Sequence, residues 1–353
     1  MSGPIPLNPA QKAAIDHTGA PALVLAGAGS GKTRVITQRI AKLITDGFPA
    51  QSIYAVTFTN KASEEMADRL EKIAGARAKK VWISTFHALG AEIARQEAKL
   101  IAGGDRFVVY DAADAMGVVK EILRELKVTD RRYDAGAIMA RISRAKNAMA
   151  LPEDLDDGTE YDEITRSVFP RYQAALGRLK ALDFDDLIGV PLKLLLENAD
   201  VRERWTSRIR HLLVDEFQDT NRTQLLFAKA LAGTRGEIFC VGDDDQSIYG
   251  WRGADIRNIL DFDTHFPGSR KLALEQNYRS RQPILDVANV VIARAERAYP
   301  KTLFSDRKHG DKGVLVECDN NESETKFVLD TAKSAISSGI PSSFTFFTNH
   351  LQW

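Results

Sequence analysis

The sequence is poor in cysteine, carries no net charge and contains no long apolar run. Its two cysteines, Cys240 and Cys318, are too few and too far apart for a disulfide framework or a zinc site. No apolar run reaches the roughly eighteen residues of a membrane span, and the first ten residues lack the basic-then-apolar pattern of a leader peptide. We therefore expect a cytoplasmic protein without membrane contact, in which Cys240 is a buried core residue.

The balance of charge limits how the chain can bind a polyanion. Its 48 lysines and arginines match 48 aspartates and glutamates, so no overall electrostatic field attracts nucleic acid. Any such binding has to use local basic patches and stacking on aromatic rings. At 353 residues and 44% hydrophobic content, the chain is long enough to fold into two or three domains.

A glycine-rich turn follows the first apolar run. Residues 22–26 predict a buried strand, and apolar residues at helical spacing after the turn predict a helix. The turn lets successive N–H groups point into one concavity that fits phosphate oxygens. Lys32 would face the β- and γ-phosphates, and the Thr33 hydroxyl would bind magnesium. Ala26 replaces the usual first glycine of this pattern, and a merely flexible loop before a lysine is the alternative. The turn reads Ala26-Gly27-Ala28-Gly29-Ser30-Gly31-Lys32-Thr33.

Two adjacent carboxylates follow the strand predicted over residues 211–214. Asp215 is placed to hold magnesium through water, and Glu216 to take a proton from the attacking water. An Asp-Glu pair alone is far more typical of an exposed surface than of a metal site. In this sequence the pair indicates a metal and a general base only because Lys32 and Thr33 are also present.

Other strand ends add polar and aromatic residues. Strands are predicted over residues 53–57, 81–84, 238–243 and 272–274, and the carboxyl ends of parallel strands line the ligand crevice of an open sheet. Gln246 is a candidate contact for the γ-phosphate, and Gln11 is either a surface residue or a reader of the adenine edge. Aromatic rings at these ends either stack on bases or pack in the core. They are Phe58, Phe86, Tyr249 and Trp251.

Between residues 88 and 182 helical periodicity replaces the strand–helix alternation. Asp111 and Asp134 stand at predicted helix starts. We expect an all-helical insertion between two halves of the α/β domain. Its basic residues form either a cationic face or an ordinary solvated face. They are Arg141, Arg144, Lys146, Arg171, Arg178 and Lys180.

The last segment begins a new pattern after Pro283. We expect a helix from residue 284, a strand over 313–317, a helix over 322–337 and a Phe-rich strand over 344–347.

In this order the segments resemble the motif series of superfamily 1 DNA helicases of the UvrD/Rep/PcrA branch, over about residues 7–350. The matching segments are 7–11, 26–33, 57–62, 85–87, 214–219, 241–254 and 276–280. The resemblance implies an α/β RecA-like P-loop NTPase with a parallel sheet. Its first lobe would comprise residues 1–88 and 188–282, its helical insertion 89–187, and an incomplete second lobe 283–353.

The resemblance also implies roles. ATP and Mg²⁺ would be the cofactors, and single-stranded and 3′-tailed duplex DNA the substrates, with 3′-to-5′ movement and unidentified repair or replication proteins as partners. Gln11 and Tyr278 would hold adenine, Arg34 and Arg279 the phosphates, with Arg279 as an arginine finger, and Gln246 would couple the γ-phosphate to DNA. Residues expected to contact the strand are Phe58, Asn60, Phe86, His87, Phe184, Tyr249 and Trp251.

The expected second lobe loses the family pattern after residue 342 and lacks the second catalytic arginine. An arginine finger is worth roughly 10³ to 10⁵ in rate. We therefore expect nucleotide and weak single-strand binding with little steady turnover from this chain alone. Two alternatives remain open: an ATP-responsive DNA-binding module without unwinding activity, and the motor part of a helicase–nuclease.

Overall fold

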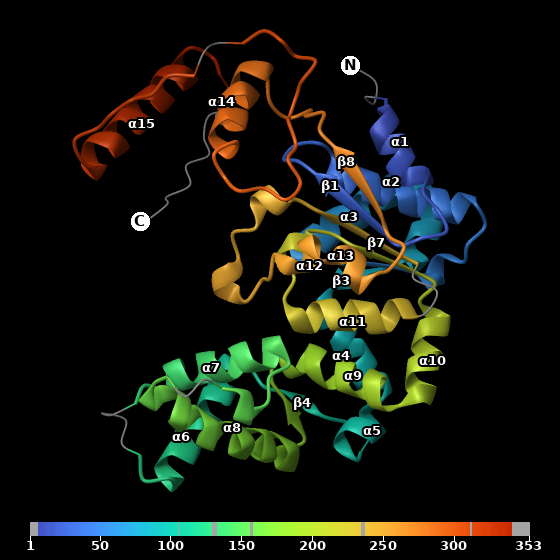
Figure 1. Ribbon diagram of the computed structural model, residues 1–353, viewed down its shortest axis with the longest axis vertical. Helices are drawn as coiled ribbons and strands as arrows, with labels where there is room; N and C mark the ends of the chain where they lie inside the picture. Colours follow the sequence, from blue (N-terminus) through green and yellow to red (C-terminus); the bar gives the residue numbers. More distant parts are fainter. Residues whose placement is uncertain are drawn as a thin grey trace. The chain divides into compact units, whose positions relative to one another are not determined.

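A parallel sheet of six strands organises the first part of the computed structural model (Figure 1). The structure describes residues 6–104, 106–128, 133–155, 158–233, 237–310 and 313–340. The strand order is β3-β2-β6-β7-β1-β8, and all carboxyl ends meet at one edge because every pair is parallel. The strands are β1 (Ala22–Ala26), β2 (Ile53–Thr57), β3 (Trp82–Thr85), β6 (His211–Val214), β7 (Ile238–Gly242) and β8 (Arg270–Leu274).

Helices cover both faces of this sheet, which explains why its central strands are continuously apolar. Alternate residues of one strand enter different cores: Leu23 packs with the first and Val24 with the second. The second core is completed by α1 (Pro9–Asp16), α2 (Lys32–Thr45) and α3 (Asn60–Ala74). The first core is completed by α4 (Phe86–Gln96), α9 (Asp186–Glu197), α10 (Ala199–Arg208), α11 (Arg222–Ala232), α12 (Arg257–Leu260) and α13 (Phe262–His265).

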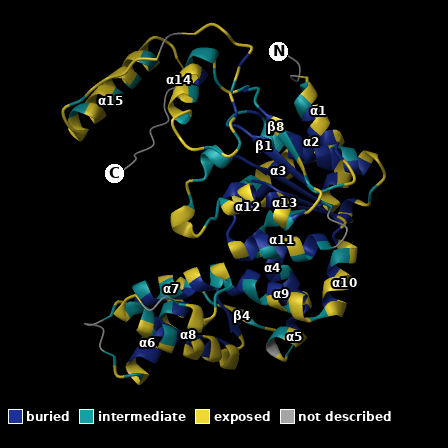
Figure 2. Ribbon diagram, in the orientation of Figure 1, coloured by how far each residue is buried: buried dark blue, intermediate teal, exposed yellow. Residues whose placement is uncertain are grey.

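The predicted strands of the sheet are confirmed, because burial on both faces leaves a strong local pattern. β2 and β6 have the predicted bounds, and β3 is shifted by one residue. Figure 2 shows the central strands β1, β2, β6 and β7 in the buried colour. Cys240 is fully buried in β7, as expected. None of the described helices is long and apolar enough to cross a bilayer.

The segment between α4 and α9 forms a core of its own (Figure 1). Asp111 and Asp134 cap its helices α6 and α7, as predicted. The expectation of an entirely helical insertion is wrong in one detail: β4 pairs with β5 in parallel. Strands of two residues leave no period-2 pattern to detect. The elements are α5 (Ala98–Ala102), β4 (Val108–Val109), α6 (Ala112–Glu125), α7 (Ala135–Ala148), α8 (Glu160–Leu179) and β5 (Ala181–Leu182).

The domain boundaries at residues 88, 187 and 282 stay predictions. Leu89 and Ile93 of α4 are buried in the core beside the sheet rather than in the core of the insertion. Residue contacts divide the whole chain after Lys308, so that α14 (Gln282–Ile292) belongs to the first unit.

The second unit, from residue 309 onward, contains one described helix, α15 (Asn321–Ser337), close to its predicted bounds. The strand predicted over residues 313–317 is wrong, since these residues pair with no strand in the described part of the chain. Val314 and Leu315 are largely exposed there. A short apolar run forms a strand only when a neighbouring strand takes up its backbone hydrogen bonds. The Phe-rich strand predicted over 344–347 lies outside the described residues.

We predict that Gly90→Ala destabilises the fold. A Cβ at residue 90 would lie 2.0 Å from the main-chain oxygen of Leu187, so α4 and α9 would have to separate. We expect a loss of about 1 to 3 kcal/mol in the free energy of unfolding, measured by urea denaturation, despite the better helix propensity of alanine. The control is Gly189→Ala in α9, where a Cβ meets nothing within 4 Å. Equal stability of the two variants would contradict this close packing.

Candidate functional site

The turn between β1 and α2 forms a concave loop of main-chain N–H groups. Gly29 and Gly31 have φ of 69° and 91°, values that side chains other than glycine rarely adopt. A Cβ at Gly29 would lie 2.7 Å from Asn277, which donates from its side-chain amide to the main-chain oxygen of Ala28 at 2.5 Å. Among the described residues no side chain caps the start of α2, so its first N–H groups are open to a ligand.

A cavity of about 380 Å³ lies against this loop. Its volume falls within the range of small-molecule sites. The residues that line it come from the loop itself, from α3 and from the segments after β6, β7 and β8. They are Ala28, Gly29, Gly31, Lys32, Thr33, Arg34, Arg69, Glu216, Gln246, Tyr278 and Arg279.

One of the two predicted carboxylates, that of Glu216, meets the predicted lysine at this cavity. Lys32 Nζ lies 3.2 Å from Glu216 Oε2. Glu216 adopts the left-handed conformation, with φ of 48°, and its carboxylate also accepts a 3.0 Å hydrogen bond from Gln218. A left-handed backbone at a residue other than glycine costs of order 1 to 3 kcal/mol and recurs at functional sites.

A second cavity, of about 470 Å³, contains the groups predicted to hold magnesium. Thr33, Asp215 and Glu216 all line it. Burial, reinforced by the neighbouring Glu216 carboxylate, raises the pKa of Asp215 to about 7. The pKa of Asp219 is raised to about 6 by burial and by Glu216, and its buried Oδ1 has no hydrogen-bond partner among the described residues. Oxygen ligands whose charge is not compensated fit a site that receives a divalent cation with its phosphates.

Gln246 borders both cavities, and its contact with the γ-phosphate stays a prediction. It follows β7 and donates from its side-chain amide to Asp243. The sequence therefore places Lys32, Thr33, Asp215, Glu216 and Gln246 on three segments that the sheet edge brings together.

The residues expected to hold adenine lie beside the loop. Gln11 is fully buried, and its amide donates to the main-chain oxygen of Ser30 at 2.9 Å while its carbonyl accepts from Asn8 N–H at 3.2 Å. The surface alternative for Gln11 is therefore wrong. Tyr278 donates its main-chain N–H to Gly29, and its hydroxyl donates to Gln276 at 3.0 Å. Binding of adenine by Gln11 and Tyr278 stays a prediction.

Three arginines face the first cavity, and sequence reasoning found two of them. Arg34 and Arg279 were expected there, whereas Arg69 of α3 was not. Arg69 also forms an i,i+4 ion pair with Glu65 at 3.3 Å, which is typical of any exposed helix. Only the direction in which α3 leaves the carboxyl end of β2 shows that Arg69 faces the cavity.

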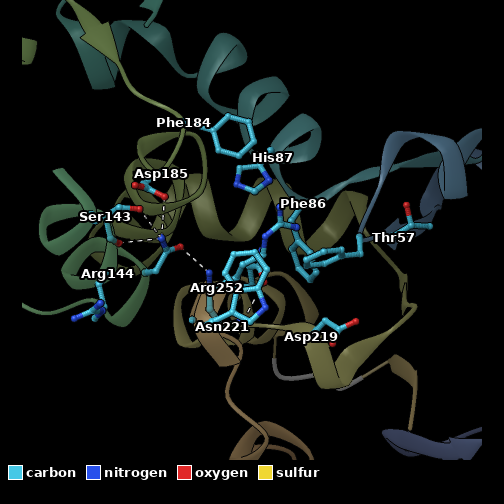
Figure 3. Close-up of a pocket in the computed structure, with 16 residues that line it drawn as sticks. Thr57, Phe86, His87, Ser143, Arg144, Phe184, Asp185, Asp219, Asn221 and Arg252 are labelled. Carbon is cyan, nitrogen blue, oxygen red and sulfur yellow. Dashed lines mark hydrogen bonds between the residues drawn. The ribbon is translucent and has the colours of Figure 1, made fainter. Parts of the chain in front are cut away.

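A third cavity, of about 560 Å³, is a groove lined by aromatic rings. His87 stacks on Phe184 with ring centroids 3.9 Å apart, as Figure 3 shows. Phe58 stacks on Tyr249 at 5.5 Å. Trp251 is 75% exposed, so the alternative of interior packing is wrong for this ring.

Two residues that were predicted to contact the DNA strand are not exposed rings of the groove. Phe86 is buried in the first core, as the packing alternative expected, although its ring also borders the groove. Asn60 is exposed at the first residue of α3 and lines none of the three cavities.

The insertion supplies one wall of the groove, which the sequence did not reveal. Asn147 of α7 donates to Asp185 at 2.8 Å and accepts from Asn221 at 2.6 Å (Figure 3). Arg144 also lines the groove. A cationic surface that includes Lys146 is wrong, because Lys146 is buried between Asp183 and Asp186, 2.6 and 2.8 Å from their carboxylates. The residues from α7 are Ala140, Ser143, Arg144 and Asn147.

Comparison with known proteins identifies the family. A sequence model of the UvrD/REP helicase N-terminal domain matches residues 7–267, and one of the UvrD-like helicase C-terminal domain matches residues 272–343. The chain belongs to the UvrD/REP helicase family. This membership confirms the resemblance and the RecA-like α/β fold.

Individual relatives of this UvrD/REP chain are named as ATP-dependent DNA helicases. It is 42% identical over 336 residues to PcrA of Bacillus subtilis (strain 168), covering 94% of the chain and 46% of the relative. It is 39% identical over 326 residues to PcrA of Staphylococcus aureus (strain Mu50 / ATCC 700699), covering 92% and 45%. It is 41% identical over 338 residues to UvrD1 of Mycobacterium bovis (strain ATCC BAA-935 / AF2122/97), covering 92% and 44%. The chain thus spans about half the length of these relatives.

We predict that His87 makes stability fall in mild acid. Burial lowers the pKa of His87 to about 4, from an ordinary 6.5. Between these values the unfolded chain binds a proton that the folded chain does not, so the free energy of unfolding falls as pH decreases. From pH 7.5 to 5.5 the wild type should lose about 1 kcal/mol more than His87→Phe, measured by urea denaturation. The phenyl ring retains a stack on Phe184 but cannot titrate. Equal losses in both proteins would rule out the lowered pKa.

Proposed function

We propose that this chain contains the ATP-hydrolysing motor of a 3′-to-5′ DNA helicase or single-strand translocase. The observation that carries the proposal is the meeting of Lys32 with Glu216 in one cavity, with Thr33 and Asp215 in the cavity beside it. Three residues line both this second cavity and the aromatic groove. They are Thr57, Phe58 and Asp219. A nucleotide and a nucleic-acid strand would therefore share side chains.

The residues at the loop fit a nucleoside triphosphate with magnesium. The N–H groups of residues 27–33 and the Lys32 ammonium would bind the phosphate oxygens, while Thr33 and Asp215 would hold the metal. Magnesium bound there would offset charge on the phosphates. Arg34 and Arg279, which line the same cavity, would also bind the phosphates, and Gln11 with Tyr278 would bind adenine.

Glu216 is the proposed general base. Its carboxylate lies beside Lys32 and accepts from Gln218, which fix its direction at the cavity. With a triphosphate bound, Lys32 would contact phosphate oxygens, and Glu216 would accept a proton from the attacking water. Gln246 would couple binding of the last phosphate to the segment that carries Tyr249 and Trp251.

Single-stranded DNA is the proposed occupant of the groove. Exposed rings on several segments provide stacking surfaces, and the Arg252 guanidinium lies 4.8 Å from the Trp251 ring centroid. The groove thus supplies local charge and stacking in a chain without net charge. The 3′-to-5′ direction, the use of 3′-tailed duplexes and a role in repair or replication rest on the family resemblance.

We predict that Lys32→Ala abolishes DNA-stimulated phosphate release. Loss of a charge that stabilises the reacting phosphates should lower kcat by about 10² to 10³. Phosphate release is measured on the 353-residue chain with and without oligo-dT. The control is Lys42→Ala on the same helix, where the lysine pairs with Asp46 at 2.8 Å away from the cavities.

The same assay separates the alternatives. A wild type that binds nucleotide and oligo-dT but releases no phosphate would favour a DNA-binding module. A wild type that binds neither would contradict the proposed function.

We predict that Trp251→Ala weakens binding of oligo-dT. Loss of one stacked base costs about 1 to 3 kcal/mol, so the Kd should rise about 5- to 150-fold, measured by fluorescence anisotropy. Leu196→Ala is the control, because Leu196 is 52% exposed and lies outside the groove. An unchanged Kd in Trp251→Ala would remove this ring from the binding surface.

A further inference from the structure

Three consecutive aspartates follow β7, immediately before Gln246. One carboxylate oxygen from each of Asp243, Asp244 and Asp245 lies within 4.8 Å of the others, and Asp243 is 2% exposed. Charges of one sign at this separation repel strongly in a buried site. A positive group has to lie among them for the turn to keep this shape.

That group is Lys301, from the segment after α14. Its Nζ lies 3.0 Å from Asp243 and 3.3 Å from Asp245, and it also contacts Asp244. The Lys301 side chain is 2% exposed. Arg297 adds a second cation, donating to Asp245 at 2.8 Å and to the main-chain oxygen of Lys301 at 3.0 Å. The ammonium occupies the position that a divalent cation would need, so the turn is no metal site.

The aspartates keep this lysine charged. Burial alone would lower the pKa of Lys301, but the surrounding carboxylates outweigh burial and raise it. The cluster is therefore a fixed ionic contact at neutral pH. Removal of one partner from such a buried cluster leaves uncompensated charge.

Asp243 extends this contact into the nucleotide cavities along two routes. Its carboxylate accepts from the Gln246 side-chain amide, and Gln246 lines both cavities. Its main-chain N–H donates to Gln218 Oε1 at 3.0 Å, and Gln218 in turn donates to Glu216 at 3.0 Å. Lys301 is thus separated from Gln246 by one carboxylate, and from Glu216 by Asp243 and Gln218.

The segment that carries Lys301 also touches the phosphate loop. A Cβ at Gly27 would lie 2.3 Å from Leu303, so the loop that carries Gly27 and the segment that carries Leu303 are in close contact. Phe304 donates its main-chain N–H to Glu275 and accepts from Asn277, two residues before Arg279. Residues 301–304 therefore lie against the segments after β1, β7 and β8.

We propose that Lys301 is a positioning residue: through Asp243 it holds Gln246 and Gln218 at the nucleotide cavities, so that contact with the last phosphate depends on the segment after α14. The expected effect of Lys301 on nucleotide binding rests on the proposed function. The arrangement itself stands on the ion pairs alone. Lys301 touches neither cavity, so it acts through Gln246 and Gln218.

The first test compares binding of mant-ADP and mant-ATPγS by fluorescence titration. Lys301→Met should lower the preference for ATPγS about tenfold while the Kd for ADP changes less than twofold, and Lys301→Arg should restore most of the preference. Gln246→Ala should match Lys301→Met, and the double variant should lose no more than either. Lys271→Met is the control, because Lys271 pairs with Asp263 at 2.5 Å outside the cavities. Equal weakening of ADP and ATPγS by Lys301→Met would show an effect on folding only and would overturn the proposal.

The second test needs no nucleotide. Urea denaturation of the two single variants and the double variant gives their effects on the unfolding equilibrium constant. If Lys301 positions Gln246, the combined effect is smaller than the product of the separate effects by threefold or more. Effects that multiply would overturn the proposal. If the wild type binds neither nucleotide, the proposed function fails, and this coupling alone decides the role of Lys301.

Discussion

The contact between Lys32 and Glu216 depends on the parallel direction of β1 and β6. An ion pair whose side chains are 11% and 36% exposed contributes at most about 1 kcal/mol, too little to bring two distant segments together. The sheet does this instead, since its two buried cores fix the register and all strands end at the same edge. The charges are held in place by apolar packing at a distance from them. Their spacing can therefore serve a ligand rather than the stability of the fold.

Much of this arrangement could be predicted because its determinants are local. Residues 22–33 contain a strand, a glycine turn and a helix start, and Asp215 follows directly on the four apolar residues of β6. Parallel strands then bring these ends together without further information. Asp111 and Asp134 were identified as helix caps for the same reason, since a cap acts on the N–H groups of its own first turn.

The features that escaped prediction depend on partners distant in the sequence. From the sequence alone Lys146 resembles a surface cation, but in the structure Asp183 and Asp186 enclose it. Asn147 lines the groove because α7 packs beside α11, and no motif marks it. The expected strand at 313–317 shows the converse error, since its short apolar run was interpreted without a neighbouring strand. A periodic pattern predicts which face of a segment is apolar, but the partner decides whether a strand forms.

The polar groups at the sheet edge form a connected set. Gln218 donates to both Glu216 and Asp219, and it accepts from the main chain of Asp243, so it joins the ends of β6 and β7. Asp219 borders the groove as well as the cavity of Thr33. A strand in the groove that changes the position of Asp219 must therefore change hydrogen bonds to Gln218, whose other bonds reach Glu216 and Asp243. Since Gln218, Asp219 and Asp243 are buried, none of them can leave its partner without the cost of an unpaired polar atom. That cost provides a physical link between the groove and the geometry of the cavity that Lys32 and Glu216 line.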